Sequence, residues 1–119
     1  DTASEVLRAA TSGHLVLSTI HANNITDAIN SVVKYASSTA MSEELAYDLF
    51  SRGMLGVLHQ TLHGVKNKTP LVSYLFTNPD STRGDQVRGI IKGGKLNLAT
   101  SIETQMTRMS RGKNIFPEI

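Results

Sequence analysis

The chain has 119 residues, with 12 Lys and Arg against 10 Asp and Glu and no cysteine. This length is typical of one domain, and the 39% hydrophobic and 18% charged content predicts a soluble globular chain. The lack of cysteine excludes disulfides and cysteine-ligated zinc. No run approaches the roughly 18 apolar residues of a membrane span, and no signal-peptide pattern is visible. We therefore expect a cytoplasmic location.

Positive charge is concentrated toward the C-terminus. Residues 81–119 carry seven basic residues against three acidic ones, a net charge of +4. Such a tail is typical of a solvated helical surface, or of a surface that binds nucleic acid, acidic lipid or an acidic protein. Its one aromatic residue, Phe116, gives little for bases to stack on. A small basic module that binds nucleic acid or an acidic partner stays an alternative, which salt-sensitive DNA binding would favour.

The first three predicted elements precede residue 40. Residues 2–12 are strong helix formers with apolar side chains at helical spacing, and Gly13 is placed to end a helix there. The run HLVLSTI at 14–20 is apolar, contains β-branched residues and is too short for a stable helix, so it predicts a buried strand. Asn24 is predicted to cap a helix whose apolar stripe extends to Ala36.

A long helix and a second strand are predicted next. The helix is expected to begin at Ser42 and to continue to about His63, with two glycines weakening its middle. Residues 71–77, LVSYLFT, alternate in character and include aromatic side chains, which predicts a strand.

The last part of the chain is predicted to be a loop and two helices. NPDSTRGD at 78–85 is typical of a loop, and residues 86–112 indicate two helices broken at Gly93 and Gly94. The resulting order of elements, α-β-α-α-β-α-α, predicts an α/β fold.

A glycine-rich stretch at 89–96, GIIKGGKL, comes close to the phosphate-binding P-loop motif. The motif needs Ser or Thr after its lysine to ligate Mg²⁺, and Leu96 stands there instead. The residues before it are polar, whereas a P-loop follows a buried strand. We therefore interpret this stretch as a helix break.

Two histidines near the middle of the chain, His59 and His63, are four residues apart. On a helix they would share one face and could both reach a metal ion. The spacing supplies no third ligand, and a helix end is the simpler interpretation, because histidine is favourable beside the last carbonyls. We predict no metal site, while a metal-dependent hydrolase using all four histidines of the chain stays an alternative.

His14 and His21 flank the predicted strand at 14–20. His21 would lie at its carboxyl end, which is where ligands bind in open α/β sheets. An imidazole there can donate a hydrogen bond to a phosphate oxygen as negative charge accumulates on it. The alternative is a histidine that bonds only to a neighbouring carbonyl.

The stretch SGHLVLSTIHANN at 12–24 resembles the His box of the bacterial secretion-motor ATPases. This family includes the motors of type IV pilus assembly and retraction and of type II and type IV secretion. The initial Asp-Thr falls where the family has Glu-Thr just after Walker B. GMLGVLHQTL at 53–62 is similar to the family's LLGVLAQRL, and residues 86–105 are similar to the helix pair that contains AIRNLIREGK. The resemblance covers nearly all of the chain in the same order.

The resemblance implies a division into residues 1–40, the end of a RecA-like ATPase core with the His box, and residues 41–119, a mostly helical C-terminal subdomain. It implies a homo-hexamer that hydrolyses ATP with Mg²⁺, both bound mostly by residues outside this chain. It also implies a cytoplasmic motor held at the inner membrane by pilus or secretion platform proteins. His14 and His21 match the two His-box positions, which implies catalytic roles for both and contact of His21 with the γ-phosphate.

Other positions match the family less closely. Gln60 and Arg88 fall on positions that look structural or interfacial, whereas Ser31 stands where arginine is frequent and Ala22 replaces Thr or Ser. The missing tetracysteine motif favours a retraction-like or conjugation-type branch. The resemblance implies that the chain begins just after Walker B and lacks the P-loop, so the chain by itself is expected to be inactive. No direct contact with nucleic acid is expected.

Overall fold

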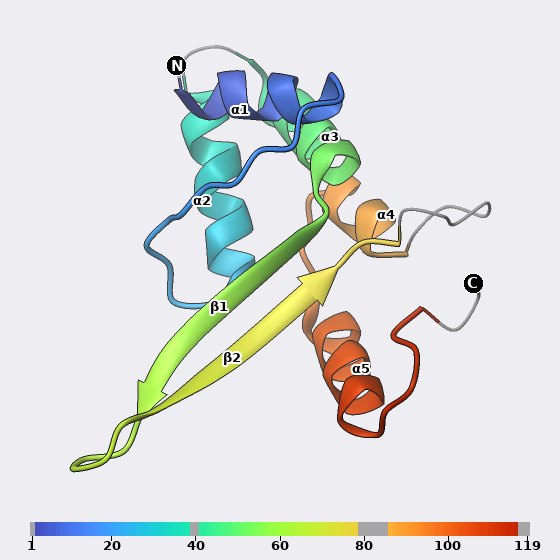
Figure 1. Ribbon diagram of the computed structural model, residues 1–119. Helices are drawn as coiled ribbons and strands as arrows, with labels where there is room; N and C mark the ends of the chain where they lie inside the picture. Colours follow the sequence, from blue (N-terminus) through green and yellow to red (C-terminus); the bar gives the residue numbers. More distant parts are fainter. Residues whose placement is uncertain (1, 39–40, 79–85, 117–119) are drawn as a thin grey trace.

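The computed structural model describes residues 2–38, 41–78 and 86–116. The elements are α1 (Thr2–Thr11), α2 (Ile25–Ser37), α3 (Glu43–Gly53), β1 (Gly56–His63), β2 (Thr69–Phe76), α4 (Gln86–Lys92) and α5 (Ala99–Ser110). Helices α1, α2 and α3 form a bundle, and α4 packs beside α3 (Figure 1). A long hairpin leads away from the bundle, and α5 packs on its strand β2. None of the helices in the described ranges is long and apolar enough to cross a membrane.

The starts of α2 and α3 are fixed by side-chain caps. The Asp27 amide donates to Oδ1 of Asn24 at 2.7 Å, and the Leu45 amide donates to Oγ of Ser42 at 3.1 Å. Each cap satisfies a backbone N–H that has no partner inside its helix. Both caps lie where the sequence predicts them, and helix α1 also confirms its prediction to within one residue.

One hydrophobic core joins the two ends of the chain. Ile29 and Val33 of α2 are fully buried, as are Leu75 of β2 and Ile91 of α4. Helix α3 packs on α1, α2 and α4, so residues far apart in sequence share this core. Its buried members are Leu7, Ile25, Ile29, Val33, Ala36, Ala46, Tyr47, Leu49, Met54, Leu75, Val87, Ile91 and Leu98.

The predicted helix at 42–63 is wrong in its second half. Helix α3 ends at Gly53, Met54 takes an extended conformation with φ −73° and ψ 128°, and residues 56–63 form strand β1. Strand β1 pairs antiparallel with β2, which confirms the strand predicted at 71–77, and His59 lies opposite Ser73. Gly53 and Gly56 weaken a helix here. Pairing with β2 supplies the backbone hydrogen bonds that a helix would have made.

The predicted buried strand at 14–20 is also wrong in this structure. Residues 14–22 have no regular secondary structure, and Leu15 and Leu17 are 76% and 90% exposed. A strand needs a neighbouring strand to bond its backbone, and the sheet formed by the described residues consists of β1 and β2. The apolar run is therefore extended without a partner.

Helices α4 and α5 confirm the predicted break at the glycine pair. Gly94 has φ +79°, a conformation that glycine adopts without strain, and a Cβ added there would lie 3.5 Å from the ring of Tyr47. Helix α5 then docks on β2 through Gln105, whose side-chain amide bonds both backbone groups of Phe76. The described fold is a mixed arrangement of helices and a small sheet, compatible with the predicted α/β class. The loop predicted at 78–85 lies outside the described residues except for Asn78.

Candidate functional site

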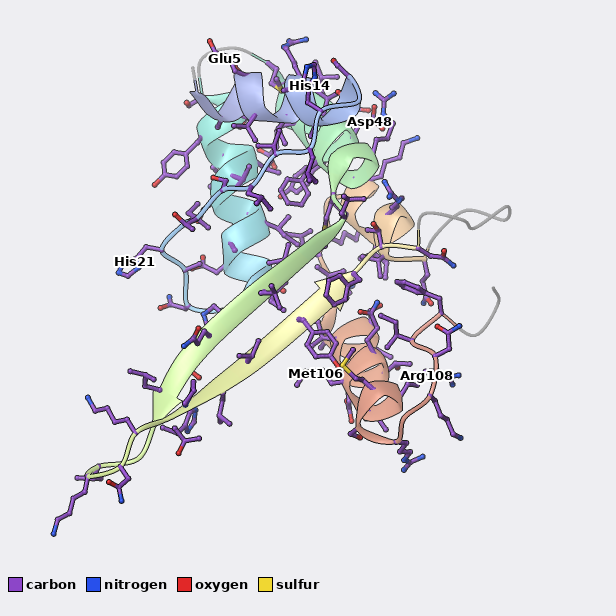
Figure 2. All side chains as sticks on the ribbon, in the orientation of Figure 1. Glu5, His14, His21, Asp48, Met106 and Arg108 are labelled. Atoms are coloured by element: carbon purple, nitrogen blue, oxygen red, sulfur yellow. The ribbon has the colours of Figure 1, made fainter. Side chains whose placement is uncertain are left out.

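His14 and His21 lie at opposite ends of the extended stretch, residues 14–22, which we call the His-box segment (Figure 2). His14 follows the turn after α1, and its amide donates to the carbonyl of Ala9 at 3.2 Å. Both imidazoles are exposed. The structure therefore does not bring the two side chains together, and His21 makes no hydrogen bond with any described residue.

The His-box segment ends against the capped start of α2. The Asn23 amide donates to Oδ2 of Asp27 at 3.0 Å, while the Asp27 amide donates to Oδ1 of Asn24. These reciprocal bonds fix the turn between the segment and the helix. His21 is thus presented to solvent a few residues before the N-terminus of α2, which carries the positive end of the helix dipole.

A third histidine contacts this segment from the hairpin. Nε2 of His59 on β1 lies 2.9 Å from the carbonyl oxygen of Ala22, the residue after His21. A carbonyl oxygen only accepts hydrogen bonds, so Nε2 of His59 carries the proton and donates it. Sequence analysis missed this role because it placed His59 on a helix, and the available signal was the pair of glycines that ends that helix early.

The structure does not bring His59 and His63 together as ligands of one ion. They lie on the same face of β1, four residues apart, and four residues of a strand span roughly 13 Å. That separation is too large for both rings to ligate one ion. Among the residues that the structure describes, no group of three or more His, Asp or Glu side chains could hold a metal ion.

The glycine-rich stretch at 89–96 does not form a phosphate loop either. Residues up to Lys92 belong to α4, and the amides of Gly93 and Gly94 donate to the carbonyls of Gly89 and Ile91. Backbone N–H groups that close the last turn of a helix are not available to hold phosphate.

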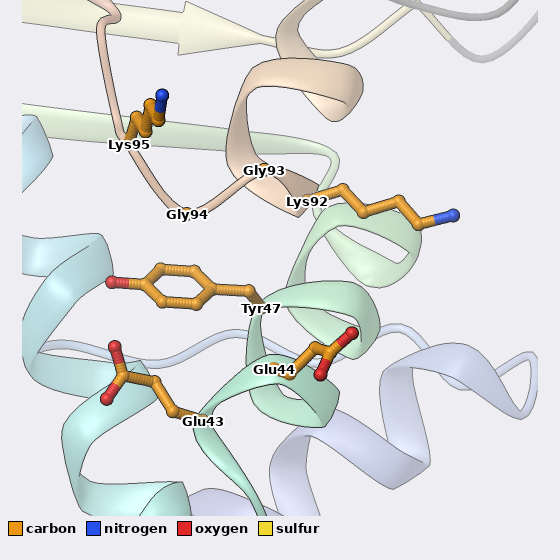
Figure 3. Close-up of a pocket in the computed structure, with 7 residues that line it drawn as sticks. All are labelled: Glu43, Glu44, Tyr47, Lys92, Gly93, Gly94 and Lys95. Atoms are coloured by element: carbon orange, nitrogen blue, oxygen red, sulfur yellow. The ribbon is translucent and has the colours of Figure 1, made fainter.

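A pocket of about 300 Å³ lies elsewhere, between the start of α3 and the connection from α4 to α5 (Figure 3). Glu43, Glu44, Tyr47 and two lysines line it, and the Tyr47 hydroxyl donates to Oδ1 of Asn30 at 3.2 Å. Burial raises the pKa of Tyr47, and the nearby Glu43 carboxylate adds to the effect. Residues of the His-box segment do not line this pocket.

Arg88 serves the packing of the hairpin and α3. Its guanidinium donates to the carbonyls of Ser51 at 2.9 Å and Arg52 at 2.5 Å, and to Oγ1 of Thr77 at 3.0 Å. These bonds satisfy carbonyls at the end of α3, which lack partners inside the helix. Gln60, the other residue expected to be structural or interfacial, is exposed on β1.

The fold and the site define a helical module with a two-stranded hairpin, in which a histidine-flanked segment leads into a capped helix. The family model described as Type II/IV secretion system protein matches residues 1–82, which include the His-box segment and both strands. The chain therefore belongs to the Type II/IV secretion system protein family, a family of ATPases. No curated protein matches the chain. The resemblance of residues 86–105 to the family's helix pair lies beyond the matched region and stays a prediction.

Proposed function

We propose that this chain is part of a hexameric motor ATPase that powers type IV pilus dynamics or type II or type IV secretion. The proposal is supported by the family match over residues 1–82 and by the exposed position of His21 within the matched region. His21 is exposed, has no hydrogen-bond partner among the described residues, and lies just before the capped start of α2.

His21 suits the task of contacting the γ-phosphate of ATP. An imidazole N–H that is free in the absence of nucleotide can donate a hydrogen bond to a phosphate oxygen, and stabilises it more strongly as negative charge develops there. His14 lies at the far end of the segment, so we assign it a supporting catalytic role separate from direct contact by His21. The division into an ATPase-core end at 1–40 and a C-terminal subdomain at 41–119 belongs to the same proposal.

ATP hydrolysis also needs a phosphate cradle and Mg²⁺. The stretch at 89–96 is helical up to Lys92 and offers no cradle, so we place both functions on residues outside this chain. Within this chain, the exposed imidazole of His21 is suited to bind a phosphate group, to which it would donate one hydrogen bond. We further propose that the motor is peripheral to the inner membrane and is held there by pilus or secretion platform proteins.

ATP turnover by the complete ATPase tests the proposal. A His21→Ala variant at matched fold and oligomeric state is expected to lose about a hundredfold or more in turnover, which is typical for removing one transition-state donor. Its affinity for nucleotide should change little. Turnover equal to that of the wild type would contradict the assignment of His21.

The 119-residue chain itself gives a second test. We expect it neither to hydrolyse ATP nor to bind it tightly, because one hydrogen-bond donor without a phosphate cradle supplies little binding free energy. Micromolar affinity for ATP in a calorimetric titration of this chain would contradict that expectation.

A further inference from the structure

The His-box segment has few attachments to the rest of the protein. Its first residue is held by the bond from the His14 amide to Ala9, and its turn into α2 is held by Asn23 and Asp27. Between these points the side chains are mostly exposed, with Leu17 at 90%. Backbone groups of residues 15–22 are therefore free to move unless another element binds them.

One contact, from strand β1, binds the backbone of residues 15–22. Within the described ranges, the hydrogen bond from His59 Nε2 to the Ala22 carbonyl is the one bond that ties residues 15–22 to the rest of the fold. It joins residues 37 positions apart in sequence and is partly buried. Its acceptor belongs to the residue directly after His21, so this bond limits where the His21 backbone can lie.

We propose that His59 is a positioning residue for His21: its ring N–H holds the Ala22 carbonyl and so orients the His21 imidazole toward the γ-phosphate. This inference rests on the proposed function of His21. A donor one peptide away from a catalytic side chain acts by reducing the number of backbone conformations available before reaction, which lowers the entropic part of the barrier. His59 itself touches neither nucleotide nor reacting atoms.

His63 provides a matched control. It lies on the same face of β1 as His59, opposite Thr69, but it is exposed, and its imidazole makes no hydrogen bond with any described residue. Replacing His63 therefore removes an imidazole from the same strand without touching the His-box segment.

The first experiment observes the contact without any ATPase activity. In the ¹³C- and ¹⁵N-labelled chain, His59→Leu should move the Ala22 carbonyl carbon signal upfield and lower the backbone order of His21 and Ala22. His59→Gln should keep both values close to wild type, because the glutamine amide places an N–H donor near the position of Nε2. His63→Leu should change neither. An Ala22 signal and an ordered His21 that survive in His59→Leu would overturn the proposal.

The second experiment measures coupling in the complete ATPase. His59→Leu should reduce kcat about tenfold with little change in KM, as expected when a catalytic group is less well oriented. His59→Gln should recover most of the loss. In the His21→Ala background, His59→Leu should cause no further loss, since the group that it positions is gone.

The two proposals fail in different ways. Wild-type turnover in His21→Ala would overturn the proposed function of His21. The other outcome is a large loss of turnover in His21→Ala and a further, multiplying loss when His59→Leu is added to it. This outcome would leave the function of His21 intact and overturn the positioning role of His59.

Discussion

Replacing Gln105, a buried polar residue on α5, should destabilise the protein. Its side chain is 5% exposed and its amide pairs with the backbone of Phe76: Oε1 accepts from the Phe76 N–H at 2.9 Å, and Nε2 donates to the Phe76 carbonyl at 2.8 Å. The amide thus completes the edge of β2 as a neighbouring strand would. Two such bonds are worth about 1 kcal/mol each, and unpaired backbone groups add to the cost. We expect Gln105→Ala to cost about 2–3 kcal/mol.

Urea unfolding of three variants tests this reasoning. Gln105→Met keeps most of the side-chain volume but has no strong donor, so it should stay nearly as unstable as Gln105→Ala. Thr104→Ala, at the exposed neighbouring position on α5, should change the free energy of unfolding by less than about 0.5 kcal/mol. Amide hydrogen exchange should show faster exchange of the Phe76 N–H in both Gln105 variants. Wild-type stability in Gln105→Met would refute the reasoning, because it would mean that packing and not hydrogen bonding holds α5.

Three further predictions concern the helix ends and the buried tyrosine. Asn24→Ala should cost about 1 kcal/mol of folding free energy, measured by urea unfolding, because the Asp27 amide loses its cap; an unchanged midpoint would contradict it. Gly94→Ala should cost roughly 1–2 kcal/mol in thermal unfolding, since alanine is strained at φ +79°, and an equal or higher Tm would argue against this. Burial and Glu43 raise the pKa of Tyr47, so its stabilising effect is fully present below the ordinary tyrosine pKa of about 10 and is lost as the pH rises through the higher folded value. Tyr47→Phe should therefore lose less stability than wild type between neutral pH and pH values above about 10; parallel curves would contradict this.

The sequence predicted correctly those helix starts and breaks that are determined by residues close together in the chain. Helix α2 begins where Asn24 can cap it, and its buried residues Ile25, Ile29 and Val33 lie in the apolar stripe that the sequence predicts up to Ala36. The break after α4 follows from a glycine pair in which Gly94 takes a positive φ. In these cases the signals, a capping side chain, an apolar stripe and a glycine pair, each lie within a few residues, so they can be recognised in the sequence.

The wrong predictions concern segments whose structure depends on a distant partner. The apolar run at 14–20 is a strand only if another strand lies beside it, and the described residues supply none. Residues 56–63 fit a helix or a strand by pattern, and pairing with β2 decides for the strand. Gln105 has no local signal either, because its partner Phe76 is 29 residues away.

In the candidate site, too, features with a local signal could be predicted and features that depend on distant residues could not. His14 and His21 could be selected from the sequence because their spacing and setting resemble a family motif. Their separation agrees with the predicted strand, which also puts them at opposite ends. Their exposure could not be predicted, since it follows from the lack of a neighbouring strand among the described residues. The contact of His59 with Ala22 depends on the path of the hairpin, 37 residues away in sequence, and became visible only in the structure.

Equilibrium binding of two nucleotide complexes to the complete ATPase tests the central claim most directly. The affinities of wild type and His21→Ala are measured for ADP and for the complex of ADP, Mg²⁺ and aluminium fluoride. In that complex, aluminium fluoride imitates the γ-phosphoryl group during its transfer. If His21 donates to that group, the variant binds ADP as tightly as wild type and binds the transition-state analogue about a hundredfold more weakly. Equal affinities of both proteins for both complexes would contradict the account.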